Sequence, residues 1–306
     1  MSVATQLAYM LVLLALGVGL RAVGVLTPSR RDYLTTLAFY VALPALVFSS
    51  TVGRALSEVL VWRLLVGVVV VLGVVAGISW LVHRGRGTPA RRGVAVVQSY
   101  HCNLGFLGVP FVAATFGGVT AGKASIILGI GSLVQVTLTV FLLTRITSGE
   151  ADVVEELRGL ARNPVLIALA LGLVGAASNV ALPGVILNPL GAIGSLALPI
   201  ALPAVGASLT ADKGFVDLPT VSVVAAVKLL VMPIVAVIVF TALAASPTTL
   251  RAGVVMLAMP TAVSTYIYSS ELGGDGDLAS ATVLATTVVA VATLLGVVHL
   301  LGVLTA

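Results

Sequence analysis

Charged residues divide the chain into long apolar runs. Uninterrupted runs cover residues 1–20, 33–53, 64–83, 93–122, 124–144, 163–211, 218–250 (broken only by Lys228), 252–270 and 278–306. A helix of about 20 apolar residues crosses the hydrocarbon core of a membrane. The run 163–211 is too long for one span and contains the turn signal Ser-Asn-Val-Ala-Leu-Pro-Gly at 178–184, so we interpret it as two helices. The pattern therefore predicts ten transmembrane helices.

Composition supports a membrane protein and argues against other classes. The chain is 59% hydrophobic and 9% charged, whereas a soluble domain has about 25% charged residues. Its net charge of +5 comes from basic residues scattered in short loops, so nucleic-acid binding is not indicated. Cys102 is the single cysteine, and no metal-ligand spacing occurs, so neither a disulfide nor a metal or other cofactor is expected. The first basic residue, Arg21, follows the first apolar run, which favours a transmembrane helix over a signal peptide.

The loop charges predict how the chain lies in the membrane. With the N-terminus outside, 11 of the 16 basic residues lie on the cytoplasmic side, four lie on the outer side, and Lys228 lies within a span. Lysine and arginine concentrate in short cytoplasmic loops. We therefore expect a multi-pass protein of the plasma or inner membrane with both termini outside.

The two halves of the chain resemble each other in order. Leu-Ala-Leu-Gly occurs at 14–17 and 169–172, Ala-Leu-Pro-Ala at 42–45 and 201–204, and Arg/Lys-Leu-Leu-Val at 63–66 and 228–231. Five spans per half is an odd number, so the second half must be inverted relative to the first. We expect a first five-helix repeat at 1–147, a cytoplasmic linker at 148–162, and a second, inverted five-helix repeat at 163–306. The acidic residues of the linker are most simply a solvated face.

The fourth and ninth spans carry helix-breaking and polar residues at mid-depth. As one straight helix, the run 93–122 would extend roughly 45 Å, against a core of about 30 Å. The fourth span contains Gln98, His101 and Asn103, then Gly105, Gly108 and Pro110; the ninth contains Pro260, Thr261, Ser264 and Thr265. Irregular backbone at membrane depth is tolerated only inside protein or beside a wet cavity. We therefore predict two broken helices whose freed peptide groups face a ligand, as in secondary transporters.

Several of these polar residues are candidates for the site, each with a structural alternative. The side-chain amide of Asn103 is suited to binding a carboxylate substrate; the structural alternative is that it hydrogen-bonds to backbone groups freed by the break. Gln98, Thr261, Ser264 and Thr265 are further candidates for contacting substrate, although hydroxyls commonly bond to their own helix. His101 is a candidate proton carrier, or a packed histidine.

Two charged residues complete the candidate set. Lys228 lies within a span, where inserting a charge costs roughly 2.5–3.5 kcal/mol. It is either a fixed cation that balances an anion or takes the place of a sodium ion, or a structural or snorkelling lysine. Glu271 closes the ninth span and is either a coupling residue or an interfacial one.

These motifs together resemble the auxin efflux carrier family, which includes the PIN-type carriers and their prokaryotic relatives. The resemblance rests on Leu-Pro-Ala at 43–45, Asn-x-Gly-x-x-Gly-x-Pro at 103–110, Asn-Pro at 163–164, Gly-Ala-Ser-Leu at 206–209, Lys-Leu-Leu-Val-Met-Pro at 228–233, and Pro260 with Glu271. It implies an elevator-type fold like that of sodium/proton antiporters, with scaffold and transport domains that each draw on both repeats, and a homodimer. Cys102 departs from the family, since PIN-type carriers have proline there.

The function expected from this resemblance is secondary transport of a small organic anion, such as auxin or a dicarboxylate, by alternating access, with possible proton coupling. Sodium-coupled symport of the bile-acid type is a rival, but the second interruption offers no acid before Glu271. Cation/proton antiport usually needs buried aspartates, and every aspartate lies outside the apolar runs. A receptor or sensor is an alternative from another class. No His-Glu-x-x-His or Gly-x-Ser-x-Gly motif points to an enzyme.

Overall fold

The computed structural model describes residues 3–148, 153–178, 182–208 and 217–304, and these residues form helices without a sheet. The first half contains α1 (Val3–Ala22), α2 (Pro28–Leu37), α3 (Leu43–Thr51), α4 (Leu56–Val59), α5 (Trp62–His83), α6 (Pro89–Gln98), α7 (Val109–Phe116) and α8 (Gly118–Thr147). The remaining helices are α9 (Val153–Ala161), α10 (Pro164–Ala177), α11 (Gly184–Ser195), α12 (Ala197–Ser208), α13 (Leu218–Ala226), α14 (Met232–Ala242), α15 (Pro247–Leu257), α16 (Ser264–Glu271) and α17 (Gly276–Leu304).

Several helices begin where the sequence places a capping residue before proline. Thr27 and Thr88 accept a backbone N–H at the starts of α2 and α6, and Asn163 does the same for α10. Proline follows each of these caps, where its missing N–H costs nothing because the first helical N–H groups have no partner within the helix. The helix starts are therefore encoded locally.

Three π-helical turns, each just ahead of a proline, interrupt the α-helical geometry. They are η1 (Ala38–Ala42), η2 (Leu104–Gly108) and η3 (Val227–Val231), followed at the second position by Pro44, Pro110 and Pro233. Proline cannot donate to the carbonyl four residues earlier, and its ring crowds that group. In the wider π-helical turn, the hydrogen bond joins residues five apart instead of four, which relieves both problems. Such turns are frequent at functional sites.

Six of the helical segments are long and apolar enough to cross a membrane. They are Pro28–Thr51, Leu56–His83, Gly118–Thr147, Gly184–Ser208, Leu218–Ala242 and Gly276–Leu304. A seventh is counted if α9 and α10, which are bent by 58° at their junction, form one span. Two shorter apolar helices, Ala8–Ala22 and Leu104–Phe116, belong to the first and fourth expected spans. The chain is thus an all-helical membrane protein, and the count of ten spans stays a prediction because the fourth and ninth runs are interrupted.

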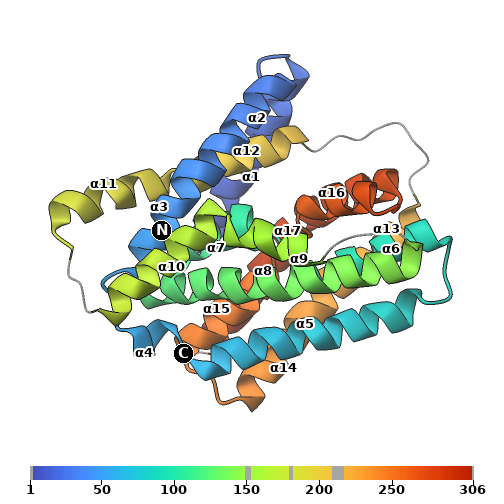
Figure 1. Ribbon diagram of the computed structural model, residues 1–306. Helices are drawn as coiled ribbons and strands as arrows, with labels where there is room; N and C mark the ends of the chain where they lie inside the picture. Colours follow the sequence, from blue (N-terminus) through green and yellow to red (C-terminus); the bar gives the residue numbers. More distant parts are fainter. Residues whose placement is uncertain (1–2, 149–152, 179–181, 209–216, 305–306) are drawn as a thin grey trace.

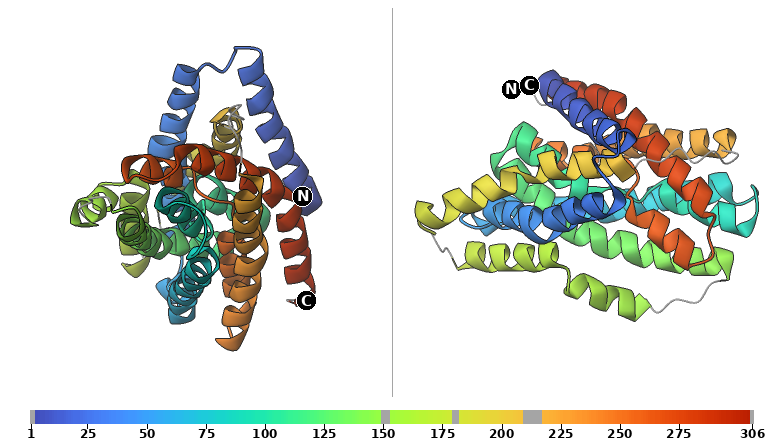
Figure 2. Two further views of the ribbon diagram at one scale, coloured as in Figure 1. Left: turned by 90° about the vertical axis from the view of Figure 1, so that its right-hand side faces the viewer. Right: turned by 90° about the horizontal axis from the view of Figure 1, so that it is seen from above.

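Glycines bring pairs of helices into close contact. A side chain at Gly17 of α1 would collide with the carbonyl of Pro203 in α12, and one at Gly172 of α10 would meet Thr51 in α3. On the opposite side of the molecule, the ring of Phe240 fills the space over two further glycines, in α5 and α15. Helices α5 and α8 run side by side along the body of the molecule, while α1 and α2 project from it (Figures 1 and 2).

The starting turn of α1 and the last turn of α17 lie at the same end of the molecule (Figures 1 and 2). The side of the membrane on which each terminus lies stays a prediction. Residues 149–152 of the expected linker and 179–181 of the expected turn lie outside the described residues.

A charged cluster joins the start of α6, the start of α13 and the α16–α17 loop. Arg91 Nε lies 2.9 Å from Asp275 Oδ2, and Nη1 lies 3.5 Å from Asp217 Oδ2. Asp217 caps α13 by accepting the backbone N–H of Thr220 at 3.2 Å and its hydroxyl at 2.8 Å. These two hydrogen bonds, and then the Arg91 guanidinium, lower the pKa of Asp217 against the opposing effect of burial. The cluster fixes three chain segments to one another.

Candidate functional site

The interruptions at 99–103 and 258–263 lie against each other, and residues 101–103 and 260–262 pair as short extended segments. The N–H of Asn103 donates to the carbonyl of Pro260 at 2.8 Å, and the N–H of Ala262 donates to the carbonyl of His101 at 3.2 Å. Between these bonds, Cys102 lies opposite Thr261 in an antiparallel bridge. The ends of α6 and α15 and the starts of η2 and α16 therefore meet at one place, which we call the crossing.

Side chains from α8 and α17 satisfy the backbone groups that the crossing leaves free. Gln135 of α8 accepts the N–H of Cys102 at 2.6 Å, and Thr286 of α17 is 3.4 Å from the nitrogen of Thr261. The hydroxyl of Thr261 donates to the carbonyl of Gln98 at 2.8 Å. Unpaired peptide groups in a buried position cost free energy, so these contacts hold the irregular backbone in place.

The side-chain amide of Gln98 also supports the crossing. Its Nε2 donates to Thr265 Oγ1 at 2.9 Å and to the carbonyl of Ala279 at 3.0 Å. The Thr265 hydroxyl in turn donates to the carbonyl of Ala262 at 2.7 Å. Gln98, Thr261 and Thr265 are completely buried and do not line a cavity at the crossing. The structure thus places these three expected ligands in the supporting framework.

A cavity of about 280 Å³, which we call the inner pocket, lies beside the crossing. Its polar lining includes His101, Asn103, Ser132, Gln135 and Ser264. The Asn103 side chain is 4% exposed, and among the described residues its amide has no hydrogen-bond partner. Ser264 is the first residue of α16, where the helix dipole favours negative charge. Of the expected ligands, Asn103, His101 and Ser264 come together here.

His101 is fixed in the wall of the inner pocket. Its Nδ1 lies 2.9 Å from Thr139 Oγ1, which also bonds to the hydroxyl of Tyr100 at 3.0 Å. On its other side, the imidazole ring lies 6.4 Å from the ring of Tyr268. This hydrogen bond sets the orientation of the imidazole and leaves its second nitrogen for other contacts.

Lys228 lies behind the crossing and does not line the inner pocket. Its Nζ is 2.8 Å from Cys102 Sγ, 3.1 Å from Met232 Sδ and 3.1 Å from the carbonyl of Leu257. Leu257 is the last residue of α15, and a cation at a helix C-terminus interacts favourably with the dipole. The side chain is fully buried, and none of the ion pairs within the described residues includes it.

The remaining expected residues take up varied positions. Gly105 lines the inner pocket, and a side chain at Gly108 would press on Met256. Pro260 accepts a bond at the crossing, as described above, whereas Pro110 lines a different cavity. Glu271 is exposed at the end of α16 and does not line the inner pocket.

Sequence reasoning missed the contribution of α8. Ser132, Gln135 and Thr139 lie along one face of this helix and contact the inner pocket or its wall. Their spacing of three and then four residues matches one helical face. Three polar residues at that spacing inside an apolar span were the signal that could have identified them.

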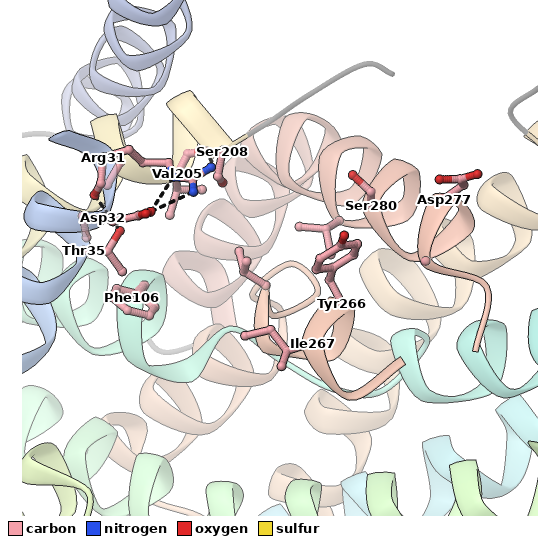
Figure 3. A pocket seen from close by; sticks show the side chains of 15 residues that line it. Arg31, Asp32, Thr35, Phe106, Val205, Ser208, Tyr266, Ile267, Asp277 and Ser280 are labelled. Atoms are coloured by element: carbon pink, nitrogen blue, oxygen red, sulfur yellow. Dashed lines mark hydrogen bonds and ion pairs between the residues drawn. The ribbon is translucent and has the colours of Figure 1, made fainter. Parts of the chain in front are cut away.

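Two further cavities include residues from the helical segments that follow the breaks. The larger, about 530 Å³, which we call the vestibule, is formed by α2, α12, α16 and α17, and reaches Phe106 of η2 (Figure 3). Arg31, Asp32 and Thr35 come together on one side of it, with Asp277 and Ser280 on the other (Figure 3). The second, about 470 Å³, which we call the outer pocket, is bordered by α1, α3, α7, α11 and α12 and has no charged residue in its lining.

Comparison with known proteins gives the family. The family model described as "Membrane transport protein" matches residues 2–298. A protein described as "Uncharacterized transporter", from Methanothermobacter thermautotrophicus, is 28% identical over 285 residues, which cover 89% of this chain and 90% of that protein. The match extends over almost the whole chain and so includes both interruptions. The chain therefore belongs to the membrane transport protein family, the auxin efflux carrier family that its motifs resemble.

Proposed function

We propose that this protein is a secondary transporter that moves a small organic anion, such as auxin or a dicarboxylate, across the membrane by alternating access. The observation that carries the proposal is the Asn103 amide, which lines the inner pocket and has no hydrogen-bond partner among the described residues, so its donors are free for a ligand.

The chemistry of the inner pocket suits a carboxylate. The Asn103 amide offers two N–H donors, and the Ser264 hydroxyl offers one more at the start of α16. No carboxylate lines the inner pocket within the described residues. In this proposal Lys228 is a fixed cation behind Cys102, and His101 supplies the proton where transport is coupled to one. The exposed position of Glu271 gives it an interfacial role.

The proposed architecture is two inverted five-helix repeats with elevator-type movement. The packing offers support, since α1 lies on α12 and α10 lies on α3, with Gly17 and Gly172 at equivalent places of the repeated Leu-Ala-Leu-Gly motif. The two larger cavities are also bordered by corresponding helices of the two halves. The vestibule is bordered by α2, α12 and α16, and the outer pocket is bordered by their counterparts in the other half, α11, α3 and α7. The proposal includes repeats at 1–147 and 163–306, termini outside, and a homodimer.

Sodium-coupled symport, cation/proton antiport and a receptor are the competing functions. A thermal-shift screen of the purified protein against auxin-like and dicarboxylic acids, with sodium and pH varied, separates the proposed function from the first two of these. We expect acids to raise the unfolding temperature without sodium. Stabilisation by cations alone, with every acid inert, would contradict the proposal.

Uptake separates a transporter from a receptor. We expect an acid that stabilises the protein to accumulate in sealed proteoliposomes, and Asn103→Ala to remove this uptake. Asn188→Ala is the matched control, because Asn188 is an exposed amide on α11, away from the inner pocket. Binding without uptake in vesicles shown to be sealed would favour a receptor.

A further inference from the structure

The vestibule and the inner pocket are neighbours with a common wall. Phe106 and Val263 line both cavities. The polar groups suited to an anion, Asn103 and Ser264, lie on the inner side of this wall. The charged groups Arg31 and Asp277 lie on the vestibule side. An anion that enters through the vestibule must therefore pass Phe106 and Val263.

Phe106 is the larger of the two side chains, and its ring is supported from the facing helix. The ring lies 6.2 Å from that of Phe39, with an angle of 34° between the planes. Phe39 itself lines the inner pocket. In Figure 3, Phe106 lies on the side of the vestibule away from Asp277 and Ser280. Phe106, with Phe39 packed beside it, thus lies between the vestibule and the inner pocket.

The backbone on both sides of this ring pair is suited to movement. Phe106 lies in η2 and Phe39 lies in η1, so each ring is carried by a π-helical turn. Phe106 is four residues before Pro110, which has no N–H for the Phe106 carbonyl. Gly105 precedes it and adds conformational freedom. Shifting such a turn by one residue rotates a side chain by about 100°, enough to swing the ring out of the passage.

We propose that Phe106 is a gate that separates the vestibule from the inner pocket and decides which anions reach Asn103. This inference rests on the proposed function, because it gives the inner pocket its route of entry. The gate closes by stacking Phe106 on Phe39 beside Val263, and it opens when η2 rotates. Because the opening is bounded by Phe106 and Val263, smaller residues there admit larger acids.

Reaction of an introduced cysteine tests the gate without any substrate. Ser132→Cys places a thiol in the inner pocket alone, and Ser280→Cys places one in the vestibule alone. The probe is an anionic methanethiosulfonate applied to purified protein, with labelled peptides identified by mass spectrometry. The protein without an added cysteine reports reaction at Cys102, which is 2% exposed. We expect Ser280→Cys to react quickly and Ser132→Cys slowly.

Adding Phe106→Ala is expected to raise the reaction rate of Ser132→Cys by roughly tenfold or more, because the aromatic pair that closes the passage is lost. Adding Tyr266→Ala, which lines only the vestibule, is the matched control and should leave that rate unchanged. Phe106→Trp, a second variant that retains an aromatic ring, should keep the rate low. Unfolding temperature and gel filtration confirm that each variant is folded.

Equal rates at the two cysteines in the parent protein, or no acceleration by Phe106→Ala in a folded protein, would overturn the gate. These outcomes do not depend on the acid. If the labelling behaves as expected and no acid is taken up by proteoliposomes, the gate stands and the proposed function fails. If acids are taken up and the labelling is indifferent to Phe106, the proposed function stands and the gate fails.

Discussion

Replacing Lys228 by methionine separates a ligand-binding role of its charge from a structural role. Methionine keeps an unbranched apolar side chain in the space that Lys228 fills, but it loses the contacts of Nζ at 2.8 Å to Cys102 and 3.1 Å to the Leu257 carbonyl. Replacing a buried charged group by an apolar one of similar volume is often neutral or stabilising. We therefore expect a folded protein with little change in unfolding temperature.

The expected loss appears in acid binding. The ammonium of Lys228 contacts Cys102, which precedes Asn103 in the chain and lines the inner pocket. Opposite unit charges about 8 Å apart attract by about 2 kcal/mol at an effective dielectric constant of about 20. This free energy corresponds to about 30-fold weaker binding. A titration of the stabilising acid in nanodiscs, read by radioligand binding, measures the change in Kd.

Lys123→Met is the matched control. Lys123 is 4% exposed, and its Nζ donates to the hydroxyls of Thr248 at 2.7 Å and Thr249 at 2.9 Å, away from the inner pocket. We expect this variant to lose stability, because the buried Thr249 hydroxyl and the half-buried Thr248 hydroxyl lose their donor, and to bind the acid as the parent does. An unchanged Kd in a folded Lys228→Met protein would refute the reasoning, whereas unfolding of Lys228→Met would assign Lys228 a structural role.

Three further predictions concern the framework, each read from unfolding in detergent. Gln135→Leu leaves the buried N–H of Cys102 without its acceptor and should lower the free energy of unfolding by about 1–3 kcal/mol; an unchanged melting curve would contradict this. Asp217→Ala removes a helix cap and should cost about 1 kcal/mol at neutral pH. Because the native pKa of Asp217 is lowered, the stabilisation by its charged form is present above the unfolded pKa of about 3.9 and is lost as the pH falls through the native pKa. The parent and variant should therefore converge in acid, and a constant gap would exclude the charge as the cause. Gly17→Ala should destabilise strongly by forcing α1 from α12, whereas Gly19→Ala, with open space around it, should be neutral or stabilising by up to about 1 kcal/mol; equal effects would argue against close packing there.

The sequence was sufficient for the class of protein and for the presence of the breaks. Polar residues and prolines marked the fourth and ninth runs as interrupted, and the breaks lie at 99–103 and 258–263. The positions were less exact, since Pro110 lies in the helical segment after the first break and Lys123, expected between two spans, lies inside α8. Capping pairs such as Thr88 with Pro89 and Asn163 with Pro164 likewise encode helix starts that the structure shows. Each of these signals is local, so neighbouring residues alone can reveal it.

The division of labour among the polar residues could not be predicted. Gln98 and Asn103 are both buried amides near the same break, yet Gln98 binds Thr265 and Ala279 while Asn103 faces the inner pocket. The difference depends on how α16 and α17 pack against α6, which involves residues far apart in the chain. The positions of the π-helical turns also could not be predicted from neighbouring residues. Pro203 lies within regular α12 although proline follows a π-helical turn elsewhere, so proline alone does not predict them.

A density map of the protein with the stabilising acid bound tests the central claim most directly. The account predicts density for the acid in the inner pocket, with its carboxylate against the Asn103 amide and the first turn of α16. Density in the vestibule or the outer pocket, with the inner pocket empty of the acid and Asn103 turned into the protein, would contradict it.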